Sequence, residues 1–152
     1  MVVEIQPLAR TAGLLAEEVD GELLVYDDQR DLACRLNRSA ALVWQNSDGQ
    51  RTVTDLVEVL SEDLGELADE DMVMVALDTL AEHGLIQSGY ELRDADASRL
   101  NRRRFLRRVG VVGAAAISVP VVHSMVVPTP AAAASGGGYT PYYVKNNQLL
   151  SR

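Results

Sequence analysis

A block of arginines two thirds of the way along the chain most constrains what this sequence can fold into. Six arginines lie between Arg99 and Arg108, and the apolar run 109–127 follows them. This apolar run is about as long as the roughly 20 residues that a helix needs to cross the hydrocarbon core of a membrane. A run of this kind is not expected inside an ordinary folded domain. We therefore expect one folded unit before the arginines and a different kind of segment after them.

The arginine block resembles a twin-arginine translocation signal, whose pattern is Ser/Thr-Arg-Arg-x-Phe-Leu-Lys. The order of a basic block, an apolar segment and small residues is that of an export signal. We expect an apolar helix over 109–127, cleavage near Ala133 or Ala134, and a twin-arginine translocase or the membrane as partner. The resemblance implies the signal residues Arg102, Arg103, Phe105 and Leu106 and the cleavage region Ala131, Ala133, Ala134 and Ser135. The alternative is an uncut transmembrane helix with a basic inner flank.

Both alternatives give the chain the same orientation. Only Lys145 and Arg152 are basic after the apolar run, so the arginine side should stay inside. We expect a cytoplasmic N-terminal domain that is membrane-associated through residues 109–127, with a tail that an export signal would carry outside.

Charge divides the chain into two unlike parts. Residues 1–98 hold all 22 acidic groups and six basic ones, a net charge of −16, and the remainder carries eight basic groups and no acidic one. Phosphates would be repelled by the first part, which argues against nucleic acid as a partner. The basic part suits an anionic membrane face.

The sequence offers no combination of residues typical of an active site. Cys34 is the single cysteine, so an intrachain disulfide and a thiolate metal cluster are both excluded. His83 and His123 lie far apart, and no Gly-rich phosphate loop follows a strand. We expect a protein that is not an enzyme and that needs no cofactor or metal.

Alternating patterns predict strands at Leu14–Val19, Glu22–Tyr26 and Leu32–Leu36. The first two flank Asp20-Gly21, a dipeptide suited to a tight hairpin turn. They predict a three-stranded antiparallel sheet.

Helical spacing begins after these strands. Ser39 is a reasonable first cap, Thr52-x-x-Asp55 resembles a capping box, and a third helix begins at Asp69 and ends at Gly84. The predicted fold is α+β: a small winged-helix-like domain of three strands and three helices, with a C-terminal apolar helix and a flexible tail. The expected divisions are a lead-in (1–13), the domain (14–90), a linker (91–100), the signal segment (101–135) and the tail (136–152).

Three stretches are similar to the PqqD family, the recognition element of ribosomally made, modified peptides. They are Leu36–Trp44, Asp48-Gly49 with Arg51-Thr52-Val53 after it, and Leu77-x-x-Leu80-x-x-x-Gly84-Leu85-Ile86. The resemblance implies that a precursor's leader peptide is held as an added strand beside the third strand, with the third helix as the other wall. The implied peptide-binding residues are Leu32, Ala33, Cys34, Arg35 and Leu36 on the edge and Met72, Val75, Ala76 and Thr79 on the helix.

Individual site residues have structural alternatives. Arg35 could pair with an acidic leader, pair with Asp31, or be a solvated strand charge. Met72, Met74 and Val75 suit a core or an ordinary helix surface as well as a groove.

Three functions follow from these patterns. In the first, the chain is an adaptor that presents a leader peptide to a modifying enzyme, radical enzymes being one candidate class. In the second, the chain is a fused precursor whose own tail is modified, cleaved and exported. The third, a membrane-anchored winged-helix regulator, fits the charge least well.

Overall fold

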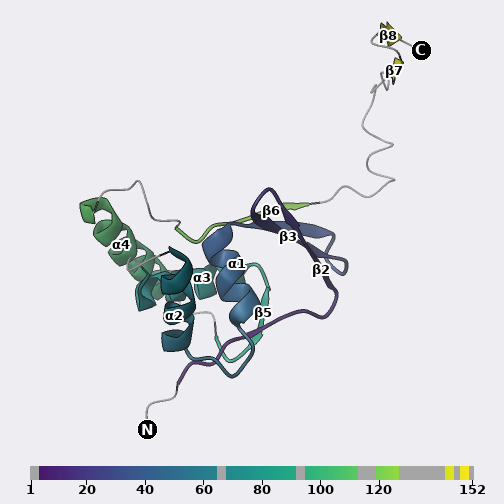
Figure 1. Cartoon of the computed structure of the whole chain (residues 1–152). Coiled ribbons are helices and arrows are strands. Elements are labelled where there is room, and N and C mark those ends of the chain that lie inside the picture. Colours follow the sequence, from purple (N-terminus) through teal and green to yellow (C-terminus); the bar gives the residue numbers. More distant parts are fainter. Residues whose placement is uncertain are drawn as a thin grey trace.

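A computed structural model describes residues 4–64, 68–91, 95–112, 119–126, 143–145 and 148–150 (Figure 1). The expected cleavage region, Ala131, Ala133, Ala134 and Ser135, lies outside the described residues. Of the expected apolar run 109–127, residues 109–112 and 119–126 are described.

The main sheet has four strands and not the three that were expected. The predicted strands are present as β2 (Leu14–Val19), β3 (Glu22–Asp27) and β4 (Leu32–Leu36). Positive φ angles at Asp20 (53°) and Gly21 (81°) make the expected tight turn between β2 and β3. The fourth strand, β6 (Val122–Val126), pairs with β4, so the order is β2-β3-β4-β6. The expected winged-helix character remains a prediction.

The three expected helices are α1 (Arg38–Asn46), α2 (Val53–Leu64) and α3 (Glu70–Glu82). Asn37, and not Ser39, caps α1, because its side-chain oxygen accepts from the Ala40 amide at 3.2 Å. The capping box of α2 is confirmed: the Thr52 amide donates to the Asp55 carboxylate at 2.7 Å.

The first strand and the end of the domain are joined by a second small sheet. β1 (Leu8–Ala9) pairs with β5 (Ile86–Ser88), inside the stretch expected to be a lead-in. Arg10 adds an ion pair with the buried Asp27 carboxylate at 2.5 Å. Burial works to raise the pKa of Asp27, but hydrogen bonds from Arg10 and the Gln29 amide lower it further.

The expected apolar helix over 109–127 is wrong for residues 122–126, whereas residues 109–112 are helical as the end of α4 (Ala95–Val112). This helix covers the arginine block, and residues 122–126 of the apolar run form β6. Within the described ranges, no helix has both the length and the apolar character needed to span a membrane. Two short strands, β7 (Tyr143–Lys145) and β8 (Gln148–Leu150), pair in the region expected to be a tail.

Helix α3 is the centre of the domain, packed against α1, α2 and α4 (Figure 1). Nine consecutive residues from Met72 to Leu80 are buried, which is the mark of a helix covered on all sides. Trp44 is core, as expected, and its indole N–H donates to the Leu85 carbonyl at 3.0 Å.

Candidate functional site

The edge of β4 is already covered by a strand of the same chain. β6 pairs with β4 in antiparallel register from Leu36 opposite Val122 to Leu32 opposite Val126. Figure 1 shows β6, in green, lying along this sheet although about ninety residues separate the two strands. The edge expected to receive a peptide therefore accepts an added strand over its whole length.

The register also fixes which backbone groups of β4 face β6. The Asn37 amide donates to the Val121 carbonyl at 3.2 Å, one step beyond the paired strands. Hydrogen-bonded positions alternate along an antiparallel ladder, so Arg35 opposite His123 and Ala33 opposite Met125 are the next two. The amides of Ala33 and Arg35 are thus the ones that this edge offers.

Asn37 holds the beginning of the added strand. Its side-chain amide donates to the Val119 carbonyl at 2.6 Å, and its side-chain oxygen accepts from the Val121 amide at 3.0 Å. Because the same oxygen caps α1, one side chain ties the first turn of the helix to the segment that leads into β6.

The expected helical wall is buried in the core. Met72, Val75, Ala76 and Thr79 are at most 5% exposed, so they do not line an open groove. Phe105 of α4, 1% exposed, belongs to the same core cluster. The four wall residues are therefore part of the core, and α4, which the sequence placed in an export signal, packs against the same helix.

Charge pairs fasten α4 at the start of α3. The Arg108 guanidinium lies 3.0 Å from the carboxylates of both Asp69 and Asp71, and Arg104 lies 3.8 Å from Asp71. Further along, Arg102 donates to the Thr79 hydroxyl at 3.2 Å. The basic second part of the chain thus meets the acidic first part directly.

Arg35 lies on the exposed face of the sheet, where it pairs with Glu22. The expected alternative partner, Asp31, accepts instead from the Tyr26 hydroxyl at 3.0 Å. A hollow of about 250 Å³ adjoins Arg35 and Glu22. The contact with Glu22 uses the Arg35 Nε, and the Arg35 side chain is 58% exposed, so its other N–H donors can reach an acidic group on a neighbouring strand.

Cys34, on the opposite face, is 3% exposed and has no disulfide partner. Burial raises the pKa of its thiol, so it remains protonated near neutral pH and is a poor nucleophile. This part of the edge therefore contributes packing and offers no reactive group.

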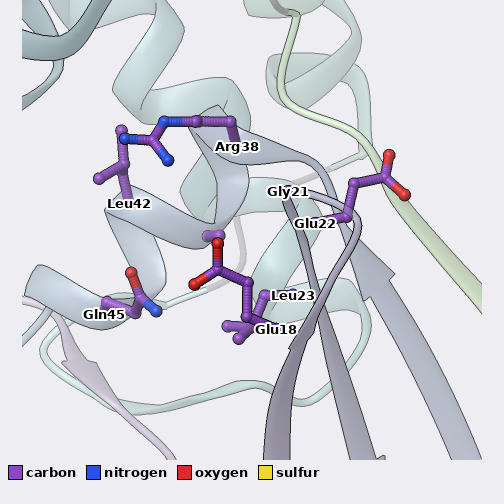
Figure 2. A pocket seen from close by; sticks show the side chains of 8 residues that line it. Glu18, Gly21, Glu22, Leu23, Arg38, Leu42 and Gln45 are labelled. Atoms are coloured by element: carbon purple, nitrogen blue, oxygen red, sulfur yellow. The ribbon is translucent and has the colours of Figure 1, made fainter.

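A second hollow lies between the β2–β3 hairpin and α1. Figure 2 shows Glu18 and Leu23 facing Arg38, Leu42 and Gln45 across it. Its volume is about 40 Å³, far below the several hundred Å³ of typical ligand pockets. It does not suit a small-molecule substrate.

Neither expected set is open to solvent as an empty groove. Leu32 to Leu36 are paired along their edge with β6, and the four wall residues are buried in the core. Sequence reasoning missed Asn37 and β6 itself. The signal for β6 was present: Val119, Val121 and Val122 are β-branched and flank Pro120, a pattern that favours a strand over a helix.

Comparison with known proteins gives a family match over part of the chain. The family model described as "Coenzyme PQQ synthesis protein D (PqqD)" matches residues 22–86, which run from the start of β3 to the start of β5. No curated protein and no solved structure matches the chain. The matched stretch contains β4 and α3 but neither α4 nor β6. Residues 22–86 thus form a PqqD-like element within a longer chain.

Proposed function

We propose that the PqqD-like element is a non-catalytic recognition domain that binds an extended peptide as an added strand on β4. The observation that carries the proposal is the unbroken antiparallel pairing that this edge makes with β6. The PqqD match supports a precursor peptide as the natural ligand and a peptide-modifying enzyme as the partner it serves.

Strand addition explains how such a domain selects its ligand. Main-chain hydrogen bonds can hold any extended peptide, and every second side chain packs against the domain, so these side chains determine which peptides bind well. Val122, 8% exposed, lies opposite the fully buried Leu36 and fills the inner position. An apolar residue at this position of a bound peptide would gain the most, because it is the most deeply covered.

Membrane delivery by the arginine block is a further part of the proposal. Its support is the resemblance of Arg102, Arg103 and Phe105 to a twin-arginine signal, together with the orientation expected from the charges. In the folded chain Phe105 is buried, so an export machinery that reads this side chain would require α4 to leave α3.

A binding experiment tests strand addition at β4. Because β6 occupies the edge, the full chain is first opened by His123→Pro, which removes a strand amide that faces β4. A fluorescently labelled peptide of residues 119–126 is then titrated, and fluorescence anisotropy is measured. We expect saturable binding to the opened chain and severalfold weaker binding when Ala33→Pro is added, because one edge donor is lost. Equal affinity in a folded double variant would exclude this edge as the site.

A further inference from the structure

We propose that the peptide held by this domain is part of its own chain: residues 119–126 are a built-in ligand, and recognition occurs in cis. The inference rests on the proposed function, because it names the occupant of the same edge. It goes further in predicting that a separate peptide must displace β6 before it can bind.

The segment that leads into β6 is held by specific hydrogen bonds to Asn37. Asn37 bonds Val119 through its side-chain nitrogen and Val121 through its side-chain oxygen and its backbone amide. Pro120, between them, is buried. The residues directly before and after Pro120 are thus both bonded by the Asn37 side chain, which also caps α1.

Side-chain burial then falls along the strand. Val122 is 8% exposed, whereas Met125 and Val126 are 55% and 74% exposed. Specific packing is therefore concentrated where the strand begins, and its later part is held by the backbone ladder. A ligand anchored at one end and paired through its backbone at the other can leave progressively from the exposed end.

Helix α4 makes the cis arrangement selective for this chain. It packs against α3, the helix that the PqqD resemblance assigns to the second wall of the groove, with Phe105 as its buried anchor. The arginines of α4 match acidic groups at the start of α3. A separate short peptide equivalent to β6 could copy the strand but not these helix contacts.

Covalent attachment favours the internal strand further. A tethered ligand competes at an effective concentration that is set by the length and stiffness of its connection. Only ligands that bind well below that concentration would displace it. The residues after Val126, which include Tyr139, Tyr142 and Tyr143, are attached to the bound strand. A modifying enzyme recruited by this domain would meet that stretch of the same chain first.

Two proline variants of the full chain separate the cis strand from general disturbance of β6. His123→Pro removes an amide that the register directs at β4, whereas Ser124→Pro removes one on the outer edge of the sheet. Amide exchange of Ala33 and Arg35 is followed by NMR, and binding of the labelled 119–126 peptide by anisotropy.

We expect slow exchange at both amides in the unsubstituted chain and in Ser124→Pro, and exchange about tenfold faster in His123→Pro. The labelled peptide should bind His123→Pro about tenfold more tightly than the other two proteins. Fast exchange in all three proteins would overturn the cis strand. Faster exchange in His123→Pro without any peptide binding would leave the strand in place but overturn the proposed function, and with it the assignment of β6 as a ligand.

Discussion

Replacing Phe105 by alanine tests whether α4 is a separately docked element. Phe105 is 1% exposed and lies in the same core cluster as Met72 and Val75 of α3. Removing a fully buried phenylalanine side chain costs about 3–5 kcal/mol. Ion pairs of largely exposed arginines such as Arg104 and Arg108 are worth about 0.2–1 kcal/mol each, so Phe105 is expected to contribute the most to holding α4 in place.

Hydrogen exchange followed by mass spectrometry measures this opening directly. In Phe105→Ala, exchange of the α4 amides should accelerate by about a hundredfold or more, since each 1.4 kcal/mol is a factor of ten. Exchange of the amides of α1 and α2, which pack against other parts of α3, should change much less than exchange of the α4 amides.

The adjacent residue provides a matched control. Leu106 lies on the same helix but is 47% exposed, so Leu106→Ala should change stability by no more than about 0.5 kcal/mol. Equal exchange of α4 in the two variants would refute Phe105 as the anchor. Acceleration of every helix together in Phe105→Ala would show that α4 and the domain unfold as one unit.

Three further results are expected. Asn37→Asp keeps the oxygen that caps α1 but loses the donor to the Val119 carbonyl. Amide exchange followed by NMR should therefore be faster in β6 and unchanged in α1, and unchanged exchange in β6 would contradict the role of Asn37 in holding this strand. Because the pKa of Asp27 is lowered in the folded protein, its carboxylate stabilises the fold at pH values above the ordinary pKa near 4, and this stabilisation is lost as the pH falls through the lowered pKa. The difference in unfolding free energy between the unsubstituted protein and Asp27→Asn, measured with urea, should therefore shrink between about pH 5 and pH 2. A difference that stays constant over this range would contradict the lowered pKa. Lysine at both Arg102 and Arg103 keeps the charge but loses the planar guanidinium, so membrane delivery measured by cell fractionation should fall; full delivery would indicate a basic flank only.

Local patterns in the sequence were sufficient to predict most of the first domain. The Asp20-Gly21 turn, the Thr52 capping box and the acidic start of α3 depend on residues close together in the chain, and all three are present in the structure. The strands of the hairpin also lie where alternation placed them, because each turn fixes its neighbours' register.

Long-range contacts account for the parts that could not be predicted. The apolar run after Arg108 is compatible with a membrane helix, but β6 obtains its hydrogen bonds from β4, about ninety residues earlier. Likewise Phe105 and the arginines of α4 read as a signal until α3 is seen beneath them. A helix with an apolar run such as 72–77 of α3 needs cover on every side, and this is a clue that the sequence offered beside the valines around Pro120.

A disulfide trap tests the central claim, that the chain's own strand lies on β4, most directly. Cys34 is the only native cysteine and lies opposite Ser124 at a position between hydrogen-bonded pairs, where Cα atoms are about 4.5 Å apart and a disulfide can form. Under mild oxidation, Ser124→Cys in the full chain should lose two hydrogens by intact mass as a monomer. His123→Cys, whose side chain is on the other face, should not. Failure of Ser124→Cys to close, or equal closure of both variants, would contradict the internal strand.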